Sequence, residues 1–337
     1  MASPPARLEA IGEAMQSLDQ TPERTKRGRI AAVDVARALA LLGMAAYHLT
    51  WDLAHFGFIG PSVPFTPVMR LVSHTVASAF LALVGVSFAL AHSKGLRREA
   101  FLRRVTVVAC AAFLVTLATE FLAPEEPITF GILHCIAAAS LLAAIFVAAP
   151  IWMGFAAGAL AIAAPLVVSF DRFNGPALAW LGLGTVAPPT LDWRPLLPWS
   201  GVVLVALSLA RAVLPRVADA PWARWRPHTI AGRAMAFAGR HSLAIYLVHQ
   251  PILFAALFAL ANVTGVAARH ERTSYIAACR PACVENGGDL DLCEKACACV
   301  ADRAQAAGLP LVSTAGKGDE TRQRLRAVVD SCSSQAR

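Results

Sequence analysis

The first apolar segment, residues 29–58, carries ionisable side chains at helical spacing. They recur at steps of three or four together with two apolar residues, so they share one helical face: Asp34, Arg37, Leu41, Met44, His48, Asp52 and His55. The pair Asp34–Arg37 precedes His48 by about three turns. Histidine is the commonest general base, and a nearby carboxylate can orient it. We therefore predict a polar pathway with His48 catalytic and Asp52 as its partner.

The same pattern has two other interpretations. Asp34 and Arg37 can form an ion pair at the membrane interface while His48 bonds a neighbouring helix. Intramembrane Asp, Arg and His also mark proton and substrate paths in transporters. An inverted repeat of the spans, which many transporters have, is not visible in the sequence.

Further polar residues lie in or beside other apolar segments. Each alone is more often a satisfied interhelical hydrogen bond than a catalyst, and His134 and His249 stand out because Gly or Pro lies close by. The candidates for binding the substrate or lining its path are Trp51, Glu120, His134, Trp199, His249 and Gln250.

These residues must be positioned by membrane helices. The chain has 337 residues, 57% hydrophobic and 15% charged, which excludes an ordinary soluble domain. A span needs about 20 mostly apolar residues. The sequence predicts an all-α polytopic bundle with spans at 30–50, 67–92, 105–122, 129–149, 151–170, 196–215 and 240–264. Residues 177–188 are apolar but short and interrupted by Gly and Pro, which favours a re-entrant or interfacial piece.

The basic residues predict the orientation. The N-terminal segment and the loops after the second and sixth spans carry sixteen Lys and Arg residues, whereas the opposite loops hold Arg172 and Arg194. By the positive-inside rule the N-terminus is cytoplasmic, and seven spans place the C-terminus on the opposite side of the membrane. The net charge of +8 is then a topological feature, and no nucleic-acid partner is needed. Residues 1–28 are expected to form a disordered cytoplasmic tail.

The segment 266–337 is a different kind of sequence, polar and rich in cysteine. Two C-x3-C pairs are separated by nine residues with Gly287–Gly288 between them. Cysteines four apart share a helical face, so two short antiparallel helices can be stapled by Cys279–Cys297 and Cys283–Cys293, which is one hypothesis among the fifteen connectivities that six cysteines allow. It leaves Cys299 to pair with Cys332. We expect an extracytoplasmic domain.

Zinc bound by four thiolates and free thiols are the alternatives for this tail. Zinc sites more often show C-x2-C spacing, and the predicted location outside the cytoplasm favours disulfides. Cys110 and Cys135 fall inside apolar spans and are interpreted as packing residues. No metal is expected.

Several ordered motifs resemble a known family. RIAAVDVARALALLGMAAYHLTWDL, FLALVGVSFALA, FGILHCIAAASLL, LPWSG and GRHSLAIYLVHQPIL are similar to the bacterial heparan-alpha-glucosaminide N-acetyltransferase catalytic-domain family, over about residues 29–262. Ala38 stands where the family usually has Gly after the Arg of the first motif, and Ala still permits close helix packing. The cysteine-rich tail lies outside the resemblance.

The resemblance implies a membrane acyltransferase domain over 29–265 that moves an acyl group, expected to be acetyl, from cytoplasmic acyl-CoA to an extracytoplasmic sugar or envelope glycan. It implies that His48 is catalytic and that Asp34 and Arg37 support it. His55 is a second candidate, because in larger eukaryotic relatives the essential histidine comes later. Arg37, Arg103 and Arg104 would pair with the phosphates of CoA. The alternatives are a proton-coupled transporter and a non-enzymatic anchor that presents the cysteine-rich tail.

Overall fold

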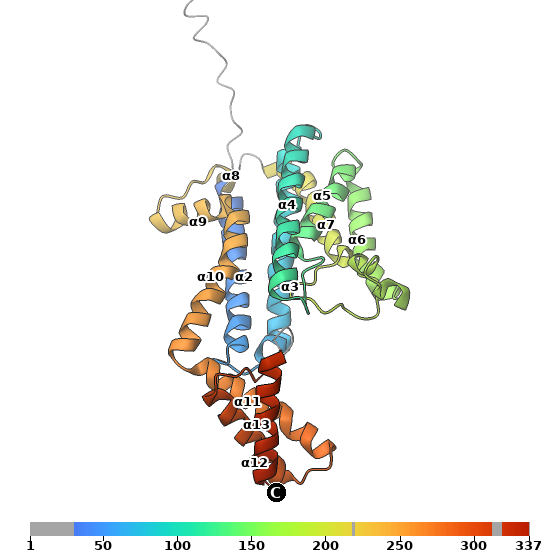
Figure 1. Ribbon diagram of the computed structural model, residues 1–337. Helices are drawn as coiled ribbons and strands as arrows, with labels where there is room; N and C mark the ends of the chain where they lie inside the picture. The colour runs from blue at the N-terminus through green and yellow to red at the C-terminus, as the bar shows by residue number, and fades with distance from the viewer. Residues whose placement is uncertain (1–29, 218–219, 312–318, 337) are drawn as a thin grey trace, which may run out of the picture. The chain divides into compact units, whose positions relative to one another are not determined.

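A computed structural model describes residues 30–217, 220–311 and 319–336 (Figure 1). The described part of the chain is all-helical, with 77% of its residues in helices and no strands, as the apolar spans predict. It divides into two compact units that do not follow chain order. Of the described residues, the first unit contains 30–40, 78–217 and 220–242, and the second contains 41–77, 243–311 and 319–336.

Seven apolar helices lie at the predicted span positions. Five are long and apolar enough to cross a membrane, which makes the chain an integral membrane protein: α2 (Ala31–His55), α3 (Pro67–Ala91), α4 (Arg98–Leu122), α7 (Leu196–Val217) and α10 (Ser242–Val263). The other two are shorter, α5 (Ile132–Phe146) with 15 residues and α6 (Ile151–Val167) with 17. At about 1.5 Å per residue they measure about 22 and 26 Å, against a hydrocarbon core of about 30 Å.

Small residues allow close helix packing in the first unit. A Cβ at Gly158 of α6 would lie 3.1 Å from the carbonyl oxygen of Gly201 in α7, and a Cβ at Gly85 of α3 would collide with the carbonyl of Val203. Membrane helices use such residues because lipid supplies no hydrophobic force between them. The α7 helix therefore packs backbone to backbone against α6 and α3.

The short elements of the first unit connect these helices. The irregular segment 168–195 contains two 3-10 turns, η2 (Asp171–Asn174) and η3 (Ala179–Leu181), and the predicted re-entrant piece 177–188 has only η3 as regular structure. After α7 come α8 (Pro221–Arg224) and α9 (Ile230–Arg240). The Oγ1 of Thr229 caps α9 by accepting a hydrogen bond from the N–H of Gly232.

The second unit joins membrane helices to the cysteine-rich tail. The part of α2 from Leu41 onward lies beside α10 (Figure 1), and Phe56, Leu257 and Ala261 form a buried cluster between them. Between α2 and α3 the chain passes through η1 (Val63–Phe65). Gly57, at φ +81°, turns the chain after α2, and the ring of His270 occupies the space where a side chain at this glycine would lie.

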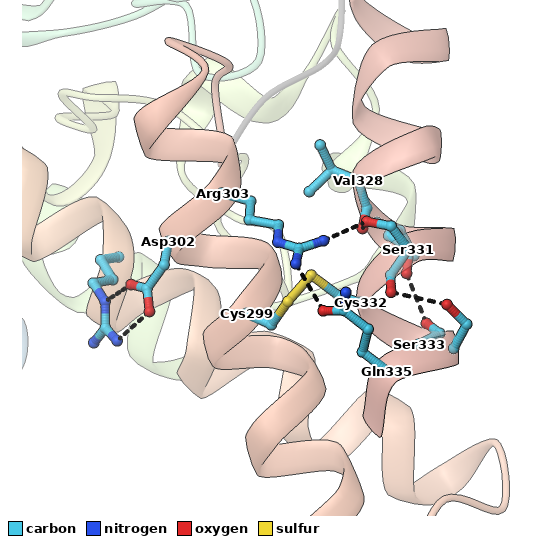
Figure 2. Close-up of a disulfide and its surroundings, with 11 residues drawn as sticks. Cys299, Asp302, Arg303, Val328, Ser331, Cys332, Ser333 and Gln335 are labelled. Atoms are coloured by element: carbon cyan, nitrogen blue, oxygen red, sulfur yellow. Dashed lines mark hydrogen bonds and ion pairs between the residues drawn. A yellow bond between two sulfur atoms is a disulfide. The ribbon is translucent and has the colours of Figure 1, made fainter. Parts of the chain in front are cut away.

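In the described part of the tail there are three helices: α11 (Val266–Glu285), α12 (Leu290–Ala306) and α13 (Asp319–Ala336). The three predicted disulfides are confirmed, since Cys279–Cys297 and Cys283–Cys293 staple α11 to α12 and Cys299–Cys332 ties α12 to α13. The third helix was not part of the predicted two-helix hairpin. Arg303 reinforces this last contact by donating hydrogen bonds to Ser331 and Gln335 (Figure 2).

The remaining predictions have mixed outcomes. Cys135 is buried as expected, but Cys110 is exposed on α4, so its predicted packing role is wrong. The expected disordered tail, residues 1–28, lies outside the described residues.

Candidate active site

Two pairs of polar side chains join α2 to α10 in the second unit. The imidazole rings of His48 and His249 lie edge to face with centroids 5.2 Å apart. One turn further along α2, Asp52 is 4% exposed, and its Oδ1 accepts a 2.8 Å hydrogen bond from Nε2 of Gln250. We call His48, Asp52, His249 and Gln250 the polar cluster. The sequence predicts that Asp52 is the partner of His48. In the structure, the hydrogen bond to the carboxylate of Asp52 comes from Gln250 instead.

The polar cluster contains unpaired buried atoms. Oδ2 of Asp52, Nε2 of His249 and Oε1 of Gln250 have no hydrogen-bond partner among the described residues. An unpaired polar group is costly in an apolar surrounding, where water cannot replace the missing partner. The cluster therefore has free capacity for a polar ligand.

The hydrogen bond of His249 to the backbone defines its tautomer. Nδ1 lies 2.7 Å from the carbonyl oxygen of Tyr246. Because a carbonyl oxygen only accepts, Nδ1 must carry the proton, and in the neutral ring Nε2 then holds a lone pair. This is the atom of His249 that has no partner.

His55 and Trp51 contact aromatic rings. The ring of His55 lies 5.0 Å from that of Phe56 and 5.5 Å from that of Phe254, centroid to centroid. Trp51 meets Phe65 edge to face at 4.9 Å. These contacts pack the end of α2 and η1, and the structure brings His48 rather than His55 into the polar cluster.

The predicted pair Asp34–Arg37 lies in the first unit. Arg37 donates a 2.7 Å hydrogen bond to Oδ1 of Asp34, which is 3% exposed, and a 2.5 Å hydrogen bond to Oγ of Ser87 in α3. The hydroxyl of Ser87 in turn donates a hydrogen bond to the backbone carbonyl of Leu83. The guanidinium of Arg37 thus joins α2 to α3. The sequence gave no indication that Ser87 accepts this hydrogen bond.

Basic residues surround an open cavity of about 500 Å³ at the start of α4. It is lined by Arg97, Arg98, Glu99, Ala100 and Arg103. Arg104, predicted beside Arg103, is exposed and does not line it. Guanidinium groups of this kind suit phosphate groups.

His92 buttresses the same end of α4. It is 6% exposed, its ring lies against those of Phe88 and Phe101, and its Nδ1 accepts a 3.1 Å hydrogen bond from the N–H of Arg97. Burial, followed by the charges of Arg104 and Arg97, lowers the pKa of the His92 imidazole. The neutral ring therefore holds the loop that leads into the cavity.

The other predicted site residues have separate environments. His134 accepts the N–H of Gly131 at Nδ1, and its Nε2 lies 3.2 Å from Oγ1 of Thr116. Trp199 is buried under the guanidinium of Arg194, at 5.3 Å, and Glu120 is exposed on α4. All three residues belong to the first unit, whereas the polar cluster belongs to the second.

Two residues that the sequence analysis did not single out as site candidates secure α5. Oδ2 of Asp192 accepts a 2.7 Å hydrogen bond from the N–H of Ile132 at the start of the helix. At its other end Arg211 donates to the carbonyls of Phe146 and Ala149, at 2.8 Å each. The sequence alone does not reveal either role, because each depends on which segments lie next to α5 in the fold.

One of three comparisons with known proteins gave a match. A family model described as heparan-alpha-glucosaminide N-acetyltransferase, catalytic, matches residues 29–251. Neither the comparison with curated proteins nor that with solved structures gave a match. The matched range includes all four residues of the polar cluster and ends before the cysteine-rich tail.

Proposed function

The chain belongs to the heparan-alpha-glucosaminide N-acetyltransferase catalytic family, and on this premise we propose that it is a membrane acyltransferase that moves an acetyl group from cytoplasmic acetyl-CoA to an extracytoplasmic sugar or envelope glycan. The observation that carries the proposal is the polar cluster, in which the rings of two histidines face each other and a buried carboxylate, one helical turn from His48, is held by Gln250, all in helices of membrane-spanning length.

The donor would bind at the start of α4. The 3′-phosphate and diphosphate of CoA carry several negative charges, and the cavity of about 500 Å³ offers Arg97, Arg98 and Arg103. Arg104 is exposed nearby and Arg37 holds Asp34 and Ser87, so we assign Arg37 a supporting role through helix α3. No metal is part of the proposed chemistry.

The reacting histidine would be His48, with His55 as the second candidate. His48 would deprotonate the acceptor or carry the acyl group. Contact with His249 supports His48, whereas the aromatic contacts of His55 favour a packing role for it.

We place the protein in a bacterial inner membrane, with the N-terminus cytoplasmic and the C-terminus periplasmic. The excess of Lys and Arg in the N-terminal segment and in two loops supports this orientation. The three disulfides of the tail support it independently, since disulfides persist in oxidising compartments.

The test is CoA release by the purified protein in detergent, with acetyl-CoA and glucosamine. The variants His48→Ala and His55→Ala are compared with His241→Gln, which removes an exposed histidine outside the polar cluster. We expect His48→Ala to lower turnover by about 10²–10⁴-fold, the usual contribution of an acid–base group. Acetylation that survives both alanine substitutions contradicts the mechanism.

A transporter is the second candidate, because unpaired buried polar atoms also suit a proton path. Proteoliposomes separate the two functions. Flux that follows a proton gradient and ignores acetyl-CoA would favour transport, and CoA release without such flux would favour the acyltransferase.

A further inference from the structure

The unpaired atoms of the polar cluster share one chemical property. Oδ2 of Asp52, Oε1 of Gln250 and Nε2 of neutral His249 all accept hydrogen bonds, and none of them has a partner in the described ranges. A ligand that satisfies them must supply O–H or N–H donors. An amino sugar has several such donors, whereas the acetyl thioester has none at its reacting end.

From this arrangement we propose that His249 is a second catalytic residue, whose Nε2 takes the proton from the acceptor, and that Asp52 and Gln250 bind the hydroxyl groups of an amino sugar beside it. The inference rests on the proposed function and assigns the acceptor side of the same site. Of the two roles proposed for His48, it leaves that of carrying the acyl group.

The backbone holds His249 ready for this task. Its Nδ1–H donates to the carbonyl of Tyr246 at 2.7 Å, which fixes the ring and directs the lone pair to Nε2. His134 provides a contrast within the same chain, because both of its ring nitrogens contact neighbouring polar groups. His249 therefore has the free buried lone pair that a general base requires.

Neighbouring residues complete the acceptor side. The ring centroid of His48 lies 5.2 Å from that of His249, so a group held by one ring is close to the other. Asp52 and Gln250 hold each other at 2.8 Å through Oδ1 and Nε2, which leaves their second oxygens for the ligand. The side-chain oxygens of Asp52 and Gln250 thus bind the hydroxyl groups of the acceptor, while its amine nitrogen faces the imidazole of His249.

The reaction balances with these groups. The amine nitrogen of the acceptor attacks the acetyl carbon and forms the C–N bond as one N–H proton moves to Nε2 of His249. The bond from the acetyl carbon to its leaving group breaks, and the electron pair stays with the leaving group. The imidazolium of His249 then returns its proton to that group, so the products are the N-acetyl sugar and the protonated leaving group.

The experiment uses two variants of the full chain in detergent. His249→Asn keeps a side-chain amide that can donate to Tyr246 but has no basic nitrogen, and His249→Gln places an amide nearer Nε2. His241→Gln is the matched control, because His241 also has Nδ1 3.0 Å from a backbone carbonyl but is exposed. The kcat/KM for glucosamine is measured from pH 6 to pH 9 with acetyl-CoA.

We expect His249→Asn to lower kcat/KM by about 10²–10⁴-fold near neutral pH. The ratio of wild-type to variant rate should then fall toward high pH, because hydroxide replaces the missing base. The acceptor titrates equally in both proteins and cancels in the ratio.

Two results would overturn the inference while leaving the proposed function intact: a wild-type rate in both His249 variants, or a loss that is constant across the pH range, which indicates a structural role. A wild type that releases no CoA with any amino sugar overturns the proposed function and this inference together.

Discussion

Gln250 and Asp52 are separated by 198 residues, yet the side-chain amide of Gln250 donates a 2.8 Å hydrogen bond to the carboxylate of Asp52. This bond joins the first apolar helix to the last within the second unit. It also orients a carboxylate that is 4% exposed. Loss of the bond would affect both the packing of α10 on α2 and the geometry of the polar cluster.

Gln250→Leu should therefore destabilise the protein. It leaves Oδ1 of Asp52 buried without its donor, which costs about 1–3 kcal/mol. Thermal unfolding in detergent measures the loss, with Asn262→Leu as the control, because Asn262 is exposed on α10 and bonds only its own helix. The double variant Asp52→Leu/Gln250→Leu should recover most of the loss, and strictly additive effects would contradict coupling between the two residues.

Arg103→Gln should weaken acetyl-CoA binding. If its guanidinium pairs with the 3′-phosphate of CoA, KM should rise about fivefold, the equivalent of about 1 kcal/mol for an exposed ion pair. The same substitution should leave the KM for dephospho-acetyl-CoA unchanged. Arg172→Gln serves as the control, since Arg172 lies over Phe170 and Phe173 away from this cavity. An equal effect on both donors would exclude the assignment to the 3′-phosphate.

The Cys299→Ser/Cys332→Ser variant should loosen α13. These cysteines are 33 residues apart, and closing a loop of this size contributes about 3–4 kcal/mol in the chain-entropy description. Limited proteolysis should then cleave the tail near α13 while the α11–α12 hairpin stays protected by its own two disulfides. Peptide mapping without reductant checks the three pairs, and any other connectivity would refute the arrangement.

Stability should depend on pH through His92. Its pKa in the folded protein is below the usual 6.5, so below pH 6.5 the unfolded chain binds the proton more readily than the folded one. The free energy of unfolding therefore falls as the pH drops from 6.5 through the lowered pKa. His92→Gln removes this part of the slope, which Tm values at pH 5 and pH 8 would reveal. His228→Gln, an exposed histidine in the same unit, is the control.

The features that could be predicted, the helices and the disulfides of the tail, are those that depend on residues close together in the sequence. Apolar runs predict the helices because each span is defined by its own residues, and C-x3-C spacing predicts two disulfides because cysteines four apart share a helical face. Cys299–Cys332 followed once the other four cysteines were paired.

The contacts that define the candidate site depend on neighbours instead. Which side chain approaches Asp52 is set by the axial register of α10 against α2, and the bond from Arg37 to Ser87 depends likewise on the register of α3. A single sequence carries no signal for such register. For the same reason, the sequence did not predict the hydrogen bond from the N–H of Ile132, at the start of α5, to Asp192.

The short lengths of α5 and α6 have a consequence for membrane topology. The two helices are consecutive, so if both dip into the bilayer and return without crossing, the number of crossings falls from seven to five. Five and seven are both odd, and a chain with either number ends on the side opposite its start. Reporter fusions at the two termini would give the same answer in both cases, whereas an accessibility label in the turn at Pro150 would differ.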